Sequence, residues 1–316
     1  MKDTITTSAP GKMMVAGEYA VLDGSPAVVV AVSRRLSAQL SPGTATDELP
    51  LEVTESLRLA AEARGVECSG SVIIDPSALR HGEEKLGLGS SAAAAAATTA
   101  AVFAQSGATL NDPATRDQIF QVANAGHRSV APHGSGADVC AAVFGGWRRF
   151  QLAGDALLSQ PLSASSKLEI RVIWTGVAAR TSAMLAKVRT LRSFEPRVYE
   201  RRIGAIAEAA ESLVQALGRT AGPELLEAVS QHHQALGALG EDCGAPIVEV
   251  RLAEIAKIAS QHGGAAKSSG AGGGDVALGF FLNAEAANAF ADVCRERGFL
   301  PLDITLGTDG VRREAR

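Results

Sequence analysis

The stretch most informative about the fold is Gly87-Leu88-Gly89-Ser90-Ser91-Ala92-Ala93, a glycine-rich turn that leads into an alanine-dominated helix over residues 92–105. Glycines let a backbone approach an anion closely, and a helix N-terminus offers free N–H groups with a partial positive charge. Ser90 and Ser91 add hydroxyls for a phosphate or a magnesium ion. A serine N-cap on an ordinary alanine helix is the alternative interpretation of the same residues.

A second segment lies near the start of the chain. It reads Ala9-Pro10-Gly11-Lys12 and continues at Gly17-Glu18-Tyr19-Ala20-Val21-Leu22-Asp23-Gly24. A lysine beside Pro-Gly is held on a stiff turn, where its ammonium can be aimed at a ligand. A solvated surface lysine is the alternative, because lysine side chains are mostly exposed in proteins.

A third segment is the most glycine-dense part of the chain. It reads Lys267-Ser268-Ser269-Gly270-Ala271-Gly272-Gly273-Gly274-Asp275. Such a run costs conformational entropy on folding, so something must require a bare backbone. Close approach to a ligand is one reason, and a flexible linker is the other. A strand expected directly afterwards, over residues 277–282, argues against the linker.

Neither glycine-rich segment is a common nucleotide-binding motif. The chain has no G-x-x-x-x-G-K-[ST] and no G-x-G-x-x-G opening a βαβ unit, which excludes a P-loop ATPase and a Rossmann dehydrogenase by motif. The four cysteines are far apart, with no C-x-x-C pair, so we expect reduced thiols that fill the core rather than a zinc or redox site.

Composition narrows the class of protein further. The chain has 316 residues, 46% hydrophobic and 20% charged, and a formal net charge of −4. The length favours two domains, and the charge argues against a nucleic-acid binder held by bulk charge. The N-terminus lacks the apolar region of a signal peptide, and the apolar run at residues 92–104 is too short to cross a bilayer. We therefore expect a cytoplasmic protein with no membrane association.

The order of the expected elements predicts an α+β fold. Strands are expected at 13–16, 26–32, 71–74, 147–152 and 168–174, with helices at 55–64, 92–105 and 113–126 between them. Three successive helices follow at 183–191, 198–217 and 225–239. A helix at 248–261, the strand at 277–282, a helix at 284–297 and a strand at 302–306 complete the chain. We place the domain boundary in the polar region Ser159–Lys167, giving domains of 1–162 and 163–316.

Together, the three segments resemble the GHMP kinases, the superfamily of galactokinase, homoserine kinase, mevalonate kinase and phosphomevalonate kinase. The order and separation of the segments match, and the resemblance covers nearly the whole chain. It implies a two-domain α+β fold, with an N-terminal domain like domain 2 of ribosomal protein S5 and a ferredoxin-like C-terminal domain. It also implies a catalytic aspartate after Gly-Ser-Gly, which here is Asp138 in His133-Gly134-Ser135-Gly136-Ala137-Asp138.

The resemblance assigns roles to these residues. Phosphoryl transfer depends on positioning and charge neutralisation, so Asp138 would accept the acceptor's proton. Lys12 would keep that carboxylate ionised and neutralise the transferred group. Ser90 would be the ligand of a magnesium cofactor. The ATP-binding residues implied are Gly87, Leu88, Gly89, Ser90, Ser91 and Ala92. The substrate-binding residues implied are Lys12, Glu18, Tyr19, Ser135, Gly136, Arg148, Arg180, Lys267, Ser269, Gly270, Ala271, Gly272 and Gly273.

Several details resemble the phosphomevalonate kinase branch. These are Gly274-Asp275, the lead-in Lys267-Ser268-Ser269, the segment from Thr175 to Ser182 and the tail from Gly298 to Asp303. The implied reaction is the ATP-dependent conversion of (R)-5-phosphomevalonate to (R)-5-diphosphomevalonate with release of ADP, by a monomer or homodimer. Alternatives are a mevalonate kinase or another GHMP small-molecule kinase, a diphosphomevalonate-decarboxylase-like lyase, and a non-catalytic ligand-binding relative.

The sequence departs from the family pattern in two places. Where mevalonate kinases carry a magnesium-binding glutamate, this chain has His127-Arg128, and upstream of the serine loop it has Glu83-Glu84-Lys85-Leu86 in place of Pro-x-Gly-Ala. A phosphorylated acceptor needs additional cations, and a solvated surface charge is the alternative for each candidate. The candidates are Arg148, Arg180, Lys187 and Lys267. His232-His233 is expected on a helix surface.

Overall fold

The computed structural model describes residues 4–43, 48–67, 70–154, 156–219 and 221–315. These residues form two compact units, each assembled from segments that are distant in sequence. Unit 1 comprises Met1–Met13, Val29–Arg148 and Thr305–Arg316, and unit 2 comprises Met14–Val28 and Arg149–Ile304. The division into family domains at residues 162 and 163 stays a prediction.

The larger sheet is built on two long strands, β1 (Ile5–Ala16) and β2 (Ala27–Ser41). The strand order is β12-β1-β2-β6-β7, and β3 (Ser71–Asp75) pairs antiparallel with β2. The other strands are β6 (Trp147–Ala153), β7 (Ala156–Leu162) and β12 (Arg312–Arg313). Both long strands exceed their predicted ranges. In β1, Thr7 is buried, and its hydroxyl donates to the carbonyl of Ala97 at 2.7 Å.

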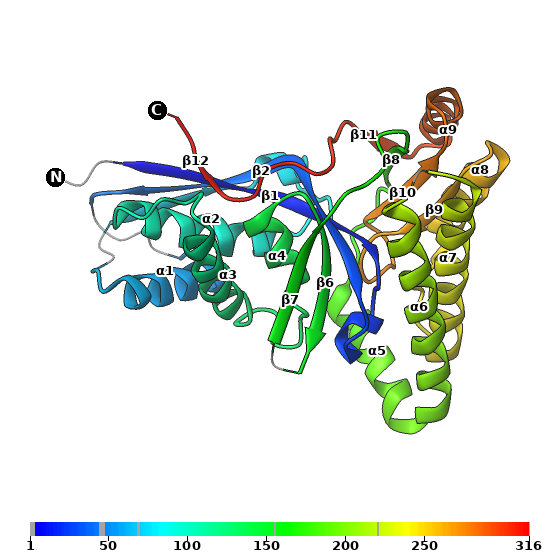
Figure 1. Ribbon diagram of the computed structural model, residues 1–316, viewed down its shortest axis with the longest axis horizontal. Helices are drawn as coiled ribbons and strands as arrows, with labels where there is room; N and C mark the ends of the chain where they lie inside the picture. The colour runs from blue at the N-terminus through cyan, green and yellow to red at the C-terminus, as the bar shows by residue number, and fades with distance from the viewer. Residues whose placement is uncertain (1–3, 44–47, 68–69, 155, 220, 316) are drawn as a thin grey trace. The chain divides into compact units, whose positions relative to one another are not determined.

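The helices of unit 1 pack around α2 (Ser90–Gln105), which confirms the predicted alanine helix. Every residue from Ala92 to Ala104 is buried, because small side chains let neighbouring helices approach closely. These neighbours are α1 (Leu51–Arg64), α3 (Pro113–His127) and α4 (Ala137–Phe144), and α1 to α3 lie side by side in Figure 1. Short elements between β3 and α2 are η2 (Ser77–Leu79), β4 (Arg80–His81) and β5 (Glu84–Lys85).

Unit 2 contains an antiparallel sheet in the order β11-β8-β10-β9. Its strands are β8 (Glu169–Trp174), β9 (Ala265–Ser268), β10 (Val276–Phe281) and β11 (Leu300–Leu302). Helices α8 (Val250–Gln261) and α9 (Ala284–Glu296) pack on it through a core that includes Ile255, Phe281 and Phe290. This combination of an antiparallel sheet with packed helices confirms the α+β prediction.

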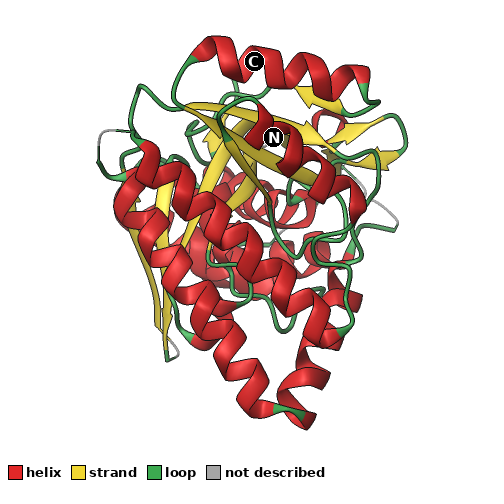
Figure 2. Ribbon diagram, turned by 90° about the vertical axis from the view of Figure 1, so that its right-hand side faces the viewer, coloured by secondary structure: helices red, strands yellow, loops and turns green. Residues whose placement is uncertain are grey.

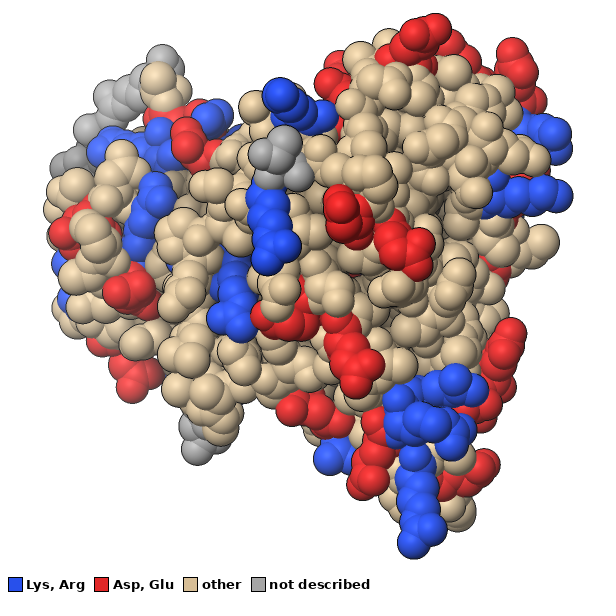
Figure 3. Space-filling model, turned by 45° about the vertical axis from the view of Figure 1, so that its right-hand side comes forward, with Lys and Arg blue, Asp and Glu red and all other residues tan. Residues whose placement is uncertain are grey.

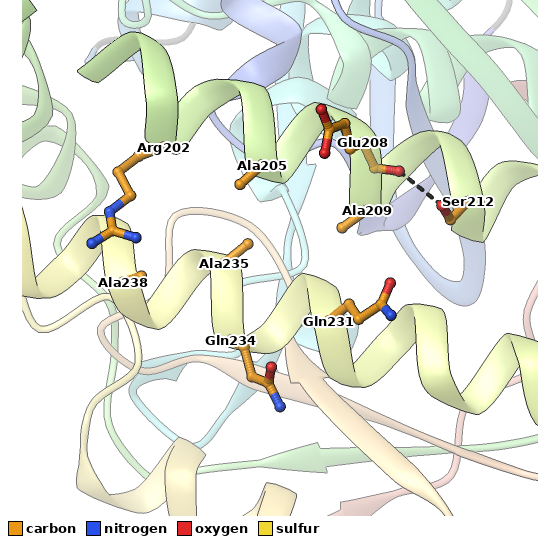
Figure 4. Close-up of a pocket in the computed structure, with 9 residues that line it drawn as sticks. All are labelled: Arg202, Ala205, Glu208, Ala209, Ser212, Gln231, Gln234, Ala235 and Ala238. Carbon is orange, nitrogen blue, oxygen red and sulfur yellow. Dashed lines mark hydrogen bonds between the residues drawn. The ribbon is translucent and has the colours of Figure 1, made fainter. Parts of the chain in front are cut away.

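Three further helices of unit 2 form a layer of their own: α5 (Thr181–Phe194), α6 (Pro196–Leu217) and α7 (Pro223–Cys243). Helices α6 and α7 run alongside each other (Figures 1 and 2). Their core includes Ile203, Ile206 and Leu236, and it also holds Tyr19 from the turn before η1 (Ala20–Asp23). An open groove between α6 and α7 is floored by alanines and edged by polar side chains such as Arg202 and Gln231 (Figure 4).

Some strand predictions were wrong. Residues 159–162, which we placed in a polar boundary region, form the end of β7, and β9 ends inside the segment that we expected to be a glycine-rich loop. The sequence Ala-Ala-Lys-Ser of β9 has no β-branched residue, so pairing with β10 decides its conformation. The last strand of unit 2 is β11 rather than 302–306.

The distribution of surface charge and the state of the cysteines agree with what the composition predicts. Positive and negative side chains are interspersed on the face shown in Figure 3. Cys140 and Cys294 are buried free thiols, as predicted, Cys243 is half-buried, and Cys68 lies outside the described residues. No helix in the described part of the chain has the length and apolar content needed to cross a membrane.

Candidate functional site

In unit 1, Lys12 and the serine loop lie against each other. The backbone N–H of Lys12 donates to the carbonyl of Leu88 at 2.8 Å. Gly89 has a φ of 76°, and a Cβ built there would fall 2.8 Å from Lys12 Cε. The absence of a side chain on Gly89 therefore makes room for the methylene chain of Lys12, and the predicted cation lies beside the predicted phosphate loop.

The serine loop ends at the N-terminus of α2. Gly89 is the N-cap and has no side chain to accept from the first helical N–H groups. Those groups and the helix dipole favour an anion at this end. Ser90 and Ser91 are half-buried in the first turn. The start of α2 thus has the donors that phosphate oxygens require.

The last turn of α3 contacts two loops of unit 1, the serine loop and the Gly-Ser-Gly loop. His127 is 4% exposed, and its Nε2 lies 3.1 Å from the hydroxyl oxygen of Ser91. Asn124, one turn earlier and also buried, lies so close to Gly136 that a Cβ there would fall 2.6 Å from Asn124 Oδ1. The serine loop and the Gly-Ser-Gly loop are therefore held by the same helix end.

Asp138 lies in the first turn of α4, whose N-cap is Gly136 with a φ of 82°. A carboxylate is favourable at this end of a helix. Its Oδ1 accepts from the N–H of Val139 at 3.1 Å, and the hydroxyl of Ser135 accepts from the N–H of Ala137 at 3.3 Å. The side chain of Asp138 is half-buried, so it is accessible to a ligand at the loop.

The predicted cations occupy different settings. The half-buried Arg148 lies over Phe144, with its guanidinium carbon 5.0 Å from the ring centroid. Arg180 is exposed at the N-cap of α5. Lys187 is exposed and its ammonium donates to the carbonyl of Gly244 at 2.5 Å. Of these, Arg148 belongs to unit 1, and Arg180 and Lys187 belong to unit 2.

The triple-glycine loop of unit 2 is tightly packed. A Cβ on Gly272 would overlap the carbonyl of Ile247, and a Cβ on Gly273, whose φ is 76°, would meet Met184 Cε at 3.3 Å. The N–H of Gly273 donates to the carbonyl of Ile247 at 3.0 Å. Such close approaches on several sides do not fit a flexible linker.

Asp275 ties this loop to the segment that precedes α5. Its Oδ1 accepts from the N–H of Ala179 at 2.9 Å, and its own N–H donates to the carbonyl of Val177 at 2.7 Å. Its φ of 55° is unusual for a non-glycine residue. Two stretches that the sequence singled out separately, Thr175–Ser182 and Gly270–Asp275, are thus adjacent in unit 2.

The turn at Glu18 and Tyr19 is buried against the same loop. Glu18 Oε1 lies 2.5 Å from the ammonium of Lys267, and the side chains of both are at most 1% exposed. The hydroxyl of Tyr19 donates to the carbonyl of Ala271 at 2.5 Å. Burial lowers the pKa of Lys267, although the Glu18 carboxylate opposes that shift. Glu18 and Lys267, both predicted to bind the substrate, contact each other in this structure, and their role towards a ligand stays a prediction.

The prediction that His232 lies on a helix surface was wrong. It is fully buried, and its Nε2 accepts from the N–H of Gly17 at 3.0 Å and lies 3.4 Å from Glu18 Oε2. Burial lowers its pKa well below the usual value. The spacing of the buried α7 residues contained this signal, because His232 falls on the same helical stripe as Leu225, Val229 and Leu236.

A protein-built metal cage is not present in the described ranges, where no three His, Cys, Asp or Glu side chains are grouped to hold an ion. Magnesium is usually held by one or two protein oxygens together with phosphates and water. The hydroxyl of Ser90 and the carboxylate of Asp138 are oxygen donors in the first turns of α2 and α4, and so fit that chemistry. The residues that line the groove of Figure 4 include none of the predicted site residues.

Comparison with known proteins gives matches to both predicted domains. The family model described as GHMP kinases N terminal domain matches residues 80–146, and the one described as GHMP kinases C terminal matches residues 213–299. The chain is 32% identical to a phosphomevalonate kinase of Streptomyces sp. strain CL190, with 98% of each chain covered. It is 24% identical to a mevalonate kinase of Aeropyrum pernix, with 99% of each covered.

A solved structure shares the fold. It is that of Streptococcus pneumoniae phosphomevalonate kinase in complex with phosphomevalonate and AMPPNP, with a TM-score of 0.81 and 20% identity, covering 96% of this chain and 99% of that one.

Proposed function

The chain belongs to the GHMP kinase family, and from that premise we propose that it transfers the γ-phosphoryl group of ATP to (R)-5-phosphomevalonate, forming ADP and (R)-5-diphosphomevalonate. The 32% identity to the Streptomyces phosphomevalonate kinase over almost the whole of both chains supports this choice of substrate. The observation that carries the chemistry is the packing of Lys12 across Gly89, because it puts a cation beside a helix N-terminus suited to phosphate.

The reaction requires one new bond and the loss of another. An oxygen of the acceptor's phosphate bonds to the γ-phosphorus of ATP, and the bond from that phosphorus to the β,γ-bridging oxygen breaks, so that ADP leaves with the electron pair. A phosphate monoester has a second pKa near 6, so it is mostly dianionic at neutral pH and needs little help from a base. Neutralising charge and aligning the two phosphates therefore matter most.

Three elements of unit 1 perform these tasks. The N–H groups from Gly87 to Ala92 bind ATP phosphates at the start of α2, and Lys12 neutralises charge on the transferred group. Asp138 orients the acceptor and accepts a proton where the acceptor oxygen carries one. His127 holds the hydroxyl of Ser91, which keeps the loop in shape.

Magnesium fits the first turn of α2, where Ser90 offers a hydroxyl oxygen. It would supply positive charge between the phosphates, as in other phosphoryl-transfer enzymes. His127 occupies the position at which mevalonate kinases have a glutamate, so this chain offers no carboxylate there. The phosphates of the nucleotide and water would then complete the ion's coordination.

The acceptor requires cations and backbone donors. In unit 2, we assign its phosphate to Arg180, Lys187 and the backbone of the triple-glycine loop, because a dianion gains charge-assisted hydrogen bonds from such groups. Arg148, in unit 1, is a separate candidate cation. The remaining proposed contacts are Tyr19, Ser135, Gly136, Ser269, Gly270, Ala271, Gly272 and Gly273.

A coupled assay of ADP release tests this function. The purified chain is given ATP and magnesium with mevalonate, phosphomevalonate or diphosphomevalonate. ADP release with phosphomevalonate, accompanied by diphosphomevalonate as product, is the expected result. ADP release with mevalonate alone would identify a mevalonate kinase. Release of CO₂ together with ADP from diphosphomevalonate would identify a decarboxylase.

A further inference from the structure

We propose that Glu18, Lys267 and His232 are positioning residues that lock the Gly17-Glu18-Tyr19 turn to the triple-glycine loop and so hold the backbone donors of that loop in place for the acceptor's phosphate. This inference rests on the proposed function. The contacts that carry it all lie within unit 2.

The ion pair is at the centre of this lock. Lys267 donates from its ammonium to Glu18 Oε1 and, at 2.6 Å, to the carbonyl of Ser268. The same Glu18 oxygen lies 3.4 Å from the N–H of Gly270, the first glycine of the loop. One carboxylate oxygen therefore contacts both the end of β9 and the loop that leaves it, so removing the carboxylate frees both.

Two more hydrogen bonds reach the triple-glycine loop, one from strand β1 and one from the turn. The N–H of Met14 donates to the hydroxyl of Ser269 at 2.9 Å, and the hydroxyl of Tyr19 donates to the carbonyl of Ala271. The turn is thus connected to the loop at Gly270 and Ala271, and strand β1 is connected to it at Ser269. Hydrogen bonds at three consecutive residues restrict the orientation of the loop's backbone.

His232 holds the turn from the side of α7. Its Nε2 accepts from the N–H of Gly17, which leaves Nδ1 to carry the proton of the neutral ring. Residues alternate along β9, so Ala266 packs in the core with α8 and α9 while Lys267 lies on the opposite face of the strand. The ion pair and His232 therefore meet on the face of β9 away from α8 and α9.

The backbone of Tyr19 indicates what the lock restrains. Its φ is 62° and its ψ is −53°, a combination that is strained for an aromatic residue. Such a conformation persists only where the surroundings over-determine it. The neighbouring anchors at Gly17, Glu18 and the Tyr19 hydroxyl supply that restraint. Among the described residues, Glu18 Oε2 is a buried oxygen with no hydrogen-bond donor.

The first experiment separates positioning from stability. Lys267→Met leaves a buried carboxylate unpaired, and Glu18→Leu/Lys267→Met removes both charges together. We expect the single variant to unfold at a lower temperature and the double variant to recover much of that loss. The double variant keeps no acceptor near Gly270, so its KM for phosphomevalonate should remain at least about fivefold above wild type, roughly the loss of one hydrogen bond, while the KM for ATP stays within about twofold.

The second experiment does not depend on the charged pair. His232→Leu removes the acceptor for the Gly17 N–H, and His232→Gln keeps one, so we expect the KM for phosphomevalonate to rise in the first and return towards wild type in the second. The adjacent His233, which is half-buried and whose Nδ1 has no hydrogen-bond partner, provides His233→Gln as a matched control.

The outcomes separate this inference from the function on which it rests. If wild type does not turn over phosphomevalonate, the proposed function is wrong and the inference falls with it. If wild type is active and the KM recovers in parallel with the unfolding temperature in the double variant, the pair is only structural. Equal KM values for His232→Leu and His232→Gln would overturn the role of His232. This test can be read even if the Glu18→Leu/Lys267→Met variant does not fold.

Discussion

The methylene chain of Lys12 lies across the bare backbone of Gly89, at a point where a Cβ would come within 2.8 Å of Lys12 Cε. The position of the lysine is therefore set by a residue of the serine loop that is far from it in the sequence. A glycine in a left-handed conformation here serves two purposes, because it begins α2 and makes room for the cation.

Gly89→Ala should impair catalysis beyond its effect on folding. The new methyl group displaces Lys12, and a displacement of about 1 Å near the reacting groups can cost about 10²-fold in rate. We therefore expect kcat/KM for ATP to fall by about that factor. Steady-state kinetics and a thermal unfolding curve measure the two effects separately.

Gly107→Ala is the matched control. Gly107 lies just after the other end of α2, has a φ of 86°, and would place a Cβ in open space. Both substitutions put a side chain on a left-handed backbone, which costs roughly 1–2 kcal/mol. Only the new Cβ at position 89 contacts Lys12. Equal losses of activity in the two variants would contradict the role given to the Lys12 contact.

Lys12→Ala should reduce kcat more than Asp138→Asn does. Removing a group that stabilises transition-state charge costs about 10²- to 10³-fold, whereas an acceptor phosphate that is already ionised needs a base less. We expect about 10³-fold for Lys12→Ala and about 10²-fold for Asp138→Asn. Both variants should still bind ATP, which equilibrium binding measures. Near-normal turnover in Asp138→Asn would remove that residue from the catalytic assignment.

Gly273→Val should weaken acceptor binding. A branched side chain at a φ of 76° is strained and meets Met184 at the loop. We expect the KM for phosphomevalonate to rise at least about tenfold, the equivalent of roughly one backbone hydrogen bond. Gly263→Val carries similar strain, with a φ of 73° and nothing within 4 Å of the new Cβ, so it should lose stability without this change in KM. An unchanged KM in a folded Gly273→Val would make the loop structural.

Phosphomevalonate should be strongly preferred over mevalonate. A dianionic phosphate gains charge-assisted hydrogen bonds from cations such as Arg180 or Lys187, whereas a neutral hydroxyl gains only ordinary hydrogen bonds. That difference costs roughly 2–4 kcal/mol, or about 30- to 1,000-fold in kcat/KM. Competition between the two substrates at fixed ATP measures the ratio. A ratio of one or below would favour a mevalonate kinase.

Helix propensity and helix-start residues were enough to predict helices α2 and α3. Alanine's helix propensity with a glycine in front of Ser90 was sufficient for α2. The helix predicted at 113–126 begins at Pro113 as α3, where the Asp112 side chain accepts from the N–H of Thr115 at 2.9 Å. β9 was missed because Ala-Ala-Lys-Ser has no strand preference of its own and becomes a strand only by pairing with β10.

The sequence by itself determined the α+β class, the family resemblance and the three segments that carry it, because these depend on residue type and order. Only the tertiary structure decided how those segments contact one another. It placed the Lys12 side chain across Gly89, buried Lys267 against Glu18 and put His232 under Gly17. Each of these contacts joins residues far apart in the chain, and no local propensity or periodicity specifies such a partner. Burial then limits what a charge can contact, since the enclosed ammonium of Lys267 lies against the carboxylate of Glu18.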